Sequence, residues 1–435
     1  MKKRAIITLT LSAMLLASCA ATPENVKNKK QGQEDKVEIG DRVTVDRLLE
    51  GAEDVSVYIK EHSYEGKFVL DNEIHIDLPE QIFELETETV QDAYLKFPEV
   101  YSELFGSDFY SDSGVKDFSE LPPQSEHLDA PGFFFDDWSS LGDGIIYTEG
   151  GATNPESKQY LEISSGGFIF YFDAKNPTDG DIKDIFNARS GSLPDTEYTM
   201  KNNEKCSLKA LIENTDQKLN AVFGNFGDQF TYHAGRVFPI VSDDGTAAMY
   251  IDVEKYYKGV SFCNHIITDY PVEGRMQYAP IYIAEADEPQ HLSELDSPYG
   301  IDRVISEKEL TDGLVPLSQS LDIMNNELSP KIELHISDIR LCYMCDYDSS
   351  EVEAALELLN SQTWQELPRE QQQQTGNPTL VTGRRYRAYP VWEFRIDRIL
   401  KDDNGNYRQK EACDLITVDV QTGELTEYFD KVSIR

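Results

Sequence analysis

The order of predicted elements along the second half of the chain constrains the fold most strongly. A helix is predicted after Ser207, with its apolar residues on one face and Gly224 at its end, and strand patterns follow it. A second helix is predicted over 350–361, where Ser350 and Glu353 form a capping box, and strand patterns follow it as well. Because regular strand and helix alternation is missing, we expect an α+β fold in which helices pack on one face of antiparallel sheets. The repeated order also predicts a duplicated unit.

Alternating apolar and polar residues predict the strands, and helical spacing predicts the remaining helices. Thr89 is expected to cap a helix through Phe97, and Pro98 to begin a short helix through Phe105. Another helix carries Leu317 and Leu328 on one face. Long loops are expected over 108–151 and 371–378, and a turn over 243–245. The expected strands are 55–59, 73–78, the hairpin 160–163 with 168–172, 236–241, 247–253, 277–283, 332–343, 386–399, 415–420 and 424–428.

The first residues of the chain have the pattern of an export signal. Lysine and arginine at positions 2–4 precede an apolar stretch over 5–17, which is too short to span a bilayer stably. Small residues at Ala17 and Ser18 then precede Cys19. This pattern resembles the lipobox of bacterial lipoproteins. The resemblance implies a diacylglyceryl group on the Cys19 sulfur and a mature chain that begins at Cys19. The alternative is an ordinary secretory signal that contains a chance cysteine.

Composition divides the rest of the chain. Residues 20–42 are polar and almost free of large apolar side chains, so we expect a disordered tether after the signal peptide 1–19. An N-terminal α+β domain is expected over 43–200, a middle domain over 201–330 and a C-terminal domain over 331–435. Two acyl chains would hold the mature protein on a membrane where one would hold it only marginally. The expected location is therefore the extracytoplasmic face of the cell membrane.

The chain is strongly acidic, with a formal net charge of −39 at pH 7. This charge repels nucleic acid and anionic lipid headgroups, so no polyanion is an expected ligand. The membrane, through the lipid anchor, is the first expected partner. Basic proteins, cationic peptides and divalent ions remain open, although an acidic surface also serves solubility alone.

Five cysteines follow Cys19, which is an odd number for a protein outside the cytosol. Cys342 and Cys345 form a C-x-x-C pair, which in other settings indicates a redox centre or half of a zinc site. Here the pair lies in a predicted strand, where residues three apart point to opposite faces. We therefore expect packed thiols. Whether disulfides form among the five stays open on sequence grounds: Cys206, Cys263, Cys342, Cys345 and Cys413.

A search for catalytic and metal motifs gives no assigned residue. The chain has no G-x-S-x-G, no H-E-x-x-H and no P-loop, and the S-x-x-K at 113–116 lacks the companion motifs of acyl-serine enzymes. The acidic segments 173–181 and 402–406 do not match an EF-hand. We expect no catalytic residue, no metal site and no cofactor. The seven histidines are dispersed and never fall at metal-ligand spacing: His62, His75, His127, His233, His265, His291 and His335.

The C-terminal segments 389–394, Y-P-V-W-E-F, and 417–425, T-V-D-V-Q-T-G-E-L, resemble PepSY-like modules and related extracytoplasmic regulators of two-component kinases. This resemblance implies small helix-plus-sheet domains and assigns no catalytic residue. The whole layout also resembles an uncharacterised lipoprotein family of Gram-positive anaerobes, through 256–260 and 336–343. Both resemblances cover roughly the second half of the chain.

These patterns together favour a non-catalytic lipoprotein that binds a protein or peptide at the cell envelope and regulates a partner such as a sensor kinase or a protease. The aromatic residues of the last strands either fill a core or expose one row of rings for docking. The alternative function is a substrate-binding lipoprotein of a transporter, which would need two parallel α/β lobes. An envelope hydrolase is the least favoured class, because it lacks a recognisable catalytic constellation.

Overall fold

The computed structural model describes residues 40–428 apart from the positions given at the end of this paragraph. The described residues belong to the unit Ile39–Arg435. None of the helices in this part of the chain combines the length and the apolar character that a membrane crossing requires. The positions left out are 72, 91–92, 114–145, 149–150, 155–158, 164–168, 174–180, 183–185, 189–192, 264–270, 273–274, 279–281, 298–300, 329–331, 349–384 and 402–406.

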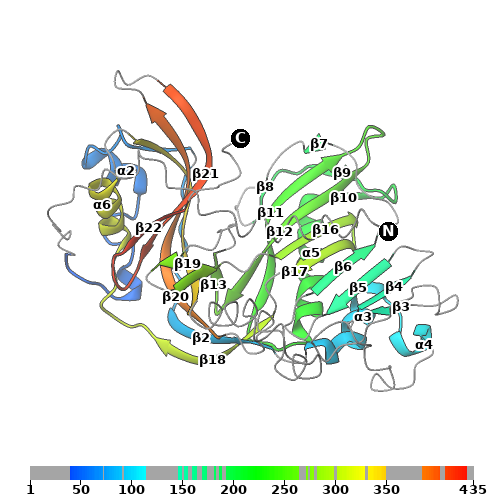
Figure 1. Ribbon diagram of the computed structural model, residues 1–435. Helices are drawn as coiled ribbons and strands as arrows, with labels where there is room; N and C mark the ends of the chain where they lie inside the picture. The colour runs from blue at the N-terminus through cyan, green and yellow to red at the C-terminus, as the bar shows by residue number, and fades with distance from the viewer. Residues whose placement is uncertain are drawn as a thin grey trace, which may run out of the picture. The chain divides into compact units, whose positions relative to one another are not determined.

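Strands dominate the described chain, and the α+β class with antiparallel sheets is confirmed (Figure 1). The paired strands are antiparallel apart from two short parallel pairings, in which β1 (Phe68–Leu70) and β13 (Val260–Phe262) lie beside β19 (Ile332–Asp348). Some antiparallel neighbours, such as β11 and β12, are joined by short turns, and others, such as β2 and β18, are far apart in the sequence.

The longest strands lie in the C-terminal part of the chain. β19 pairs along its length with β20 (Arg385–Lys401), β20 pairs with β21 (Tyr407–Asp419), and β21 turns back into β22 (Leu425–Tyr428). Gly423 makes this last turn with a φ of 75°, as glycine does at little cost. Trp392 is fully buried, and its indole Nε1 donates to the carbonyl of Val315 at 3.0 Å.

Helices α2 (Val55–Glu61) and α6 (Leu317–Glu327) lie side by side against these strands (Figure 1). The hydroxyls of Tyr58 and Tyr64 donate to the Asp322 carboxylate of α6 at 2.7 and 2.9 Å. The buried ammonium of Lys67 donates to the carbonyls of Asn325 and Leu328 at the C-terminal end of α6. A positive charge at this end of a helix also interacts favourably with the helix dipole. Residues near the start of the described chain therefore pack with residues more than 250 positions later.

A second set of antiparallel strands runs from β11 (Thr231–Val241) through β12 (Ala247–Tyr257), β16 (Tyr282–Glu288) and β17 (His291–Ser297) to β6 (Ile169–Asp173). Helix α5 (Leu208–Gly224) packs beside β11. Asn220 of α5 exchanges two hydrogen bonds with the backbone of Tyr232, and the Phe223 ring stacks on the Tyr232 ring. β12 leads through a turn into β13, which joins these strands to β19.

The remaining elements are short. Helix α3 (Phe97–Phe105) ends at Gly106, whose φ of 68° is typical of a helix C-cap. The others are η2 (Val45–Arg47), η3 (Ala93–Lys96), α4 (Phe109–Ser113), β2 (Phe83–Thr89), β3 (Ile146–Thr148), β4 (Gly151–Asn154), β5 (Gln159–Ile163), β7 (Asp181–Ile182), β8 (Phe186–Asn187), β9 (Glu197–Thr199), β10 (Lys205–Ser207), β14 (Pro271–Val272), β15 (Arg275–Tyr278) and β18 (Asp302–Glu309).

Several predicted elements are confirmed. α5 begins after Ser207, whose hydroxyl accepts from the Ala210 amide at 3.2 Å, and α6 and β20 lie where expected. The hairpin of β5 and β6 forms, as does the turn at Gly245, which has a φ of 83°. The prediction over 332–343 is right but short, since β19 continues to Asp348. The helix predicted over 350–361 lies outside the described residues.

Other predicted elements are wrong. Residues 55–59 form helix α2 and no strand, because the Asp54 carboxylate caps the helix through the Val57 amide and the buried residues Val55, Tyr58 and Ile59 share one helical face. Residues 73–78 join no ladder. Thr89 ends β2 instead of capping a helix. The predicted strand 277–283 falls on two strands, β15 and β16, and α4 and β3 lie within the predicted loop 108–151.

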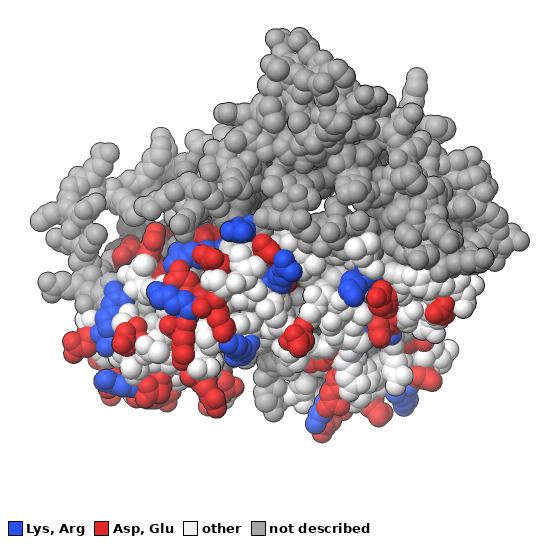
Figure 2. All heavy atoms as spheres, turned by 90° about the horizontal axis from the view of Figure 1, so that it is seen from below, with Lys and Arg blue, Asp and Glu red and all other residues white. Residues whose placement is uncertain are grey.

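The strands β2, β18 and β20 carry a ladder of opposite charges. Glu84 of β2 accepts from Arg387 of β20 at 2.6 Å, and Glu88 of β2 accepts from Arg303 of β18 at 2.6 Å. Figure 2 shows acidic and basic side chains interleaved on the face seen from below. Opposite charges that face each other on neighbouring strands attract, so each of these pairs modestly stabilises the pairing of its two strands.

Candidate functional site

The polar face of strands β11, β12, β16 and β17 is the candidate site. In the ladder, Arg236 of β11 is opposite Asp252 of β12, and Tyr250 of β12 is opposite Glu285 of β16. Glu285 is in turn opposite Glu294 of β17. Directly opposite residues of antiparallel strands share a face of the sheet. Polar side chains of four strands are therefore collected on one face, while Met249, Ile251 and Val253 are fully buried at alternate positions of β12.

One end of this polar face is neutralised by arginine. The guanidinium of Arg236 donates through Nε to Oδ2 of Asp252 at 2.7 Å and lies over the Phe238 ring, 5.5 Å from its centroid. Burial raises the pKa of Asp252, and the Arg236 charge only partly offsets that effect. The Phe238 and Tyr250 rings meet edge to face at 5.7 Å.

The other end of the polar face is acidic. Burial raises the pKa of Glu294, and the negative charges of Glu285 and Asp296 raise it further. Burial raises the pKa of Asp296 as well. Burial and the neighbouring carboxylates Asp252, Glu294 and Asp296 raise the pKa of Tyr250 to about 12. Oδ1 of Asp296 is buried and meets no hydrogen-bond donor among the described residues. Carboxylates in this environment are suited to receive a cationic group from outside.

A buried ring of four charges adjoins the same face. Arg340 of β19 donates to Glu254 of β12 at 2.6 Å and to Glu393 of β20 at 2.9 Å. Arg395 of β20 donates to Glu393 at 2.8 Å and lies 3.9 Å from Glu254. The hydroxyl of Tyr256 donates to Glu254 at 2.6 Å. Burial alone would raise the pKa values of the two carboxylates, but the positive charges of Arg340 and Arg395 have the larger, opposite effect. The pKa of Glu254 is therefore lowered, and that of Glu393 lies far below its ordinary value.

Gly235 makes room for this ring. It lies at a bulge of β11, between Ala234 and Arg236, and a Cβ atom there would stand 2.5 Å from Cγ of Glu254. A side chain at this position would collide with the buried carboxylate, so the close approach requires glycine. The ring joins β12 to β19 and β20 and has a structural function.

The cysteines downstream of Cys19 are partly described. Cys206, Cys263, Cys342 and Cys345 are free thiols, and all four are buried. The thiol of Cys342 donates to Oε2 of Glu393 at 3.2 Å. Burial raises the pKa of both Cys342 and Cys345 well above the ordinary value. The packing expected for the C-x-x-C pair agrees with this burial, while Cys413 falls in β21.

Three of the described histidines bind aspartate through Nδ1. The distances are 2.8 Å from His233 to Asp216, 2.7 Å from His291 to Asp287, and 2.9 Å from His335 to Asp71. Nε2 of His291 lies 3.5 Å from the hydroxyl oxygen of Tyr171. Tyr171 as a whole residue is fully buried. Among the described residues, no three histidine, cysteine, aspartate or glutamate side chains have the arrangement of a metal site.

Several predicted residues lie outside the described chain. They include Cys19, His127, His265, the segment 402–406 and most of 173–181, and Ser113 ends α4 while Lys116 is not described. The prediction of Cys19 as the lipid attachment residue therefore stays a prediction, as do the domain boundaries. Sequence reasoning missed the polar face. The available signal was the pair Glu294 and Asp296, two carboxylates at alternate positions of one strand.

Comparisons with known proteins add no family. No protein-family model matches the chain, and no curated protein matches it. Three solved chains match. One is an uncharacterized protein from Eubacterium rectale, with 12% sequence identity and a TM-score of 0.47 over 84% of this chain and 91% of that chain. A similarity at this level supports no conclusion about function.

Proposed function

We propose that the mature protein is held on the extracytoplasmic face of the cell membrane by a lipid on Cys19 and binds a protein or peptide partner there without catalysing a reaction. The export signal and its resemblance to a lipobox support the anchor. The partner is an envelope protein, such as a sensor kinase or a protease. The protein would then belong with the uncharacterised lipoproteins of Gram-positive bacteria that its sequence resembles.

The single observation that carries the binding proposal is the acidic end of the polar face. Glu285 and Glu294 stand directly opposite each other, although like charges at such positions destabilise a sheet. Asp296 adds a buried oxygen without a donor among the described residues. A lysine or arginine side chain of a partner would place a positive charge beside Glu294 and Asp296, and the ring of the nearby Tyr250 would contact that cation.

The finer fold proposal is a pair of related PepSY-like units. In one, α5 precedes the antiparallel strands β11 and β12, and in the other, the helix predicted over 350–361, which lies outside the described residues, precedes β20, β21 and β22. The antiparallel strands that follow each helix position are the support for this duplication. The antiparallel ladders give less support to a transporter's substrate-binding protein, for which parallel α/β lobes were expected.

Binding of a basic peptide tests the proposal. The probe is a fluorescein-labelled peptide of alternating arginine and serine, measured by fluorescence anisotropy at about 150 mM salt, where charges beyond about 8 Å are screened. We expect the double variant Glu294→Gln/Asp296→Asn to bind at least about tenfold more weakly, since loss of a desolvated charge pair costs about 2 kcal/mol or more.

The matched control is Glu86→Gln/Glu309→Gln, which removes two carboxylates from the exposed surfaces of β2 and β18. It should leave the affinity within about twofold, because exposed charges contribute little at this salt concentration. Equal losses in the two double variants would mean that the peptide responds only to net charge, and the proposed site would be wrong.

A further inference from the structure

Segments that are far apart in the sequence meet where the described chain begins. Residues 40–43 lie beside the segment that leads into α6 and beside the turn between β21 and β22. The backbones of Val43 and Leu314 exchange hydrogen bonds of 2.9 and 3.0 Å. The Val315 amide donates to the Val420 carbonyl at 2.7 Å. The first described residues are therefore attached to the fold through backbone pairing.

Two side chains strengthen this attachment. The Arg42 guanidinium donates through Nη1 to the Gly313 carbonyl at 2.9 Å and also to the Gln421 carbonyl. Gln319, in the first turn of α6, donates through Nε2 to the Asp41 carbonyl at 2.8 Å. A chain that reaches Asp41 from its N-terminal side is therefore held at one defined place on the folded unit.

From this place the chain follows α6 from its beginning to its end. The Leu317 amide, at the start of α6, donates to the Leu48 carbonyl at 2.8 Å. Tyr58 binds Asp322 farther along the helix, and Lys67 binds carbonyls at its C-terminal end. α6 has 11 residues, and a rise of about 1.5 Å per residue makes it about 16 Å long. The chain therefore enters the fold at the N-terminal end of α6.

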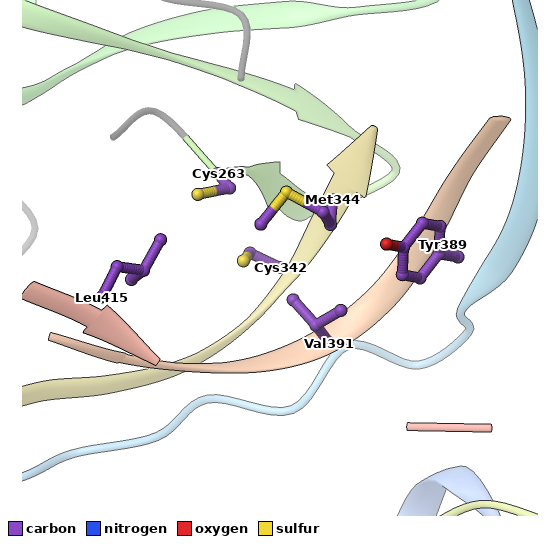
Figure 3. Packing of buried hydrophobic residues seen from close by; sticks show 6 residues of the cluster. All are labelled: Cys263, Cys342, Met344, Tyr389, Val391 and Leu415. Carbon is purple, nitrogen blue, oxygen red and sulfur yellow. The ribbon is translucent and has the colours of Figure 1, made fainter. Parts of the chain in front are cut away.

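One row of the strand ladder relates this end to the other strands. Asp419 of β21 is opposite Val391 of β20, and Val391 is also opposite Cys342 of β19. Cys342 is in turn opposite Ser261 of β13. Val391 and Cys342 pack in one buried apolar cluster (Figure 3). β12 turns into β13 at this row and extends from it for about 30 Å, at about 3.3 Å per residue, to the turn over 242–246.

We propose that the tether from Cys19 holds the N-terminal end of α6, together with the turn between β21 and β22, as the membrane-proximal end of the folded protein. This orientation rests on the proposed lipid at Cys19. Cys19 and Gly40 are 21 positions apart, and the polar composition between them predicts a coil with an average span of about 25 Å. Because β12 extends farther than this span, the turn over 242–246 should lie farther from the membrane than the attached end does.

Charge decides how the attached end meets the membrane. Its two arginines are both engaged, because Arg42 binds backbone carbonyls and Arg47 binds the Glu50 carboxylate at 2.5 Å. Asp41 and Asp46 add negative charge to the same segment. Negative charge repels anionic headgroups within a Debye length. The tether should therefore keep this end near the membrane without adhesion of the protein surface to the headgroups.

Energy transfer to a labelled lipid tests the orientation. The lipidated full-length protein is purified from the membrane fraction, labelled with one fluorophore at Thr422→Cys or at Asp243→Cys, and bound to phosphatidylcholine vesicles that contain a rhodamine-labelled lipid. Both positions are exposed turn residues, and the four described cysteines are buried, so the unsubstituted protein should give a low background. We expect at least about twofold more transfer from Thr422→Cys, because Asp243 lies about 30 Å away along β12.

A longer tether is the matched control. An insertion of about 40 glycine and serine residues after Lys30 raises the predicted average span to about 43 Å, so the ratio of the two transfers should approach one. Replacing part of the phosphatidylcholine by phosphatidylserine should leave the ratio unchanged in the protein without the insertion.

Three outcomes would overturn the orientation. Equal transfer from the two positions, or more transfer from Asp243→Cys, would place another surface toward the membrane. A ratio that survives the insertion would show that a surface of the protein adheres to the headgroups, so that the tether does not position it. A protein that fails to associate with the vesicles would contradict the lipid anchor as well, which distinguishes that failure from the other two.

Discussion

Glu393 is the residue that holds the two arginines of the buried charge ring together. Its side chain is completely buried, and Arg340 and Arg395 both donate to Oε1. Removing one partner from a buried ion pair costs more than the pair contributes, because it leaves uncompensated charge in the interior. A glutamine at position 393 would have nearly the same shape but no charge. The two buried guanidinium groups would then face only the one negative charge of Glu254.

We predict that Glu393→Gln lowers the free energy of unfolding by about 3 to 5 kcal/mol, measured by urea denaturation. Glu88→Gln is the control, because the Arg303 side chain that Glu88 binds is 62% exposed and such pairs contribute less than about 1 kcal/mol. A similar small loss in both variants would show that the ring does not stabilise the junction of β12, β19 and β20.

At the scale of elements, His335 connects β1 to β19. Its Nδ1 lies 2.9 Å from Asp71, which follows β1, and its Nε2 lies 3.1 Å from Glu333. Burial alone would lower the pKa of His335, but the hydrogen bonds and charges of Glu333 and Asp71 outweigh burial and raise the pKa above 6.5. The folded state therefore binds this proton more tightly than the unfolded chain does.

Because the folded pKa is raised, this stabilisation is fully present below about pH 6.5 and is lost as pH rises through the folded pKa. We predict that His335→Gln destabilises the protein by less than about 1 kcal/mol at pH 5.5 and by almost nothing at pH 9, since solvent screens part of the interaction. Urea unfolding of both proteins at the two pH values measures this difference. A constant or growing difference toward high pH would contradict the prediction.

Local signals made some elements predictable from sequence, and distant contacts decided the others. The Ser207 cap and the apolar face of α5 lie within one segment, so sequence reasoning found that helix. Helix α2 has only a short pattern, and its Tyr58 binds Asp322 of α6, far along the chain. The charge ring was missed for a similar reason. Glu393 and Arg395 alternate with apolar residues, as solvent-facing residues of a strand do, and their burial depends on β12 and β19.

At the scale of the whole molecule, the first question is how the chain is attached to the cell. We predict that cells grown with labelled palmitate incorporate the label into the wild type, and that Cys19→Ala loses both the label and the association with the membrane fraction, because two acyl chains supply that affinity. Cys206→Ser should keep the label. An unlabelled wild type, or a Cys19→Ala variant that stays in the membrane fraction, would contradict the lipid anchor.

β18 pairs with β2, and no other strand among the described residues pairs with it, so its second side is an edge in this part of the chain. Gln229 fills one position of this edge, accepting from the Val304 amide at 2.9 Å and donating to its carbonyl at 3.2 Å, and the ladder is irregular between Val304 and Ser306. Arg303, Glu307, Lys308 and Glu309 place exposed charges along this strand. A bare, regular edge would template the next chain and grow into filaments, as sheet proteins at high density are prone to do. The bound Gln229 side chain, the irregular ladder and the exposed charges of β18 all disfavour pairing with the edge of a second chain.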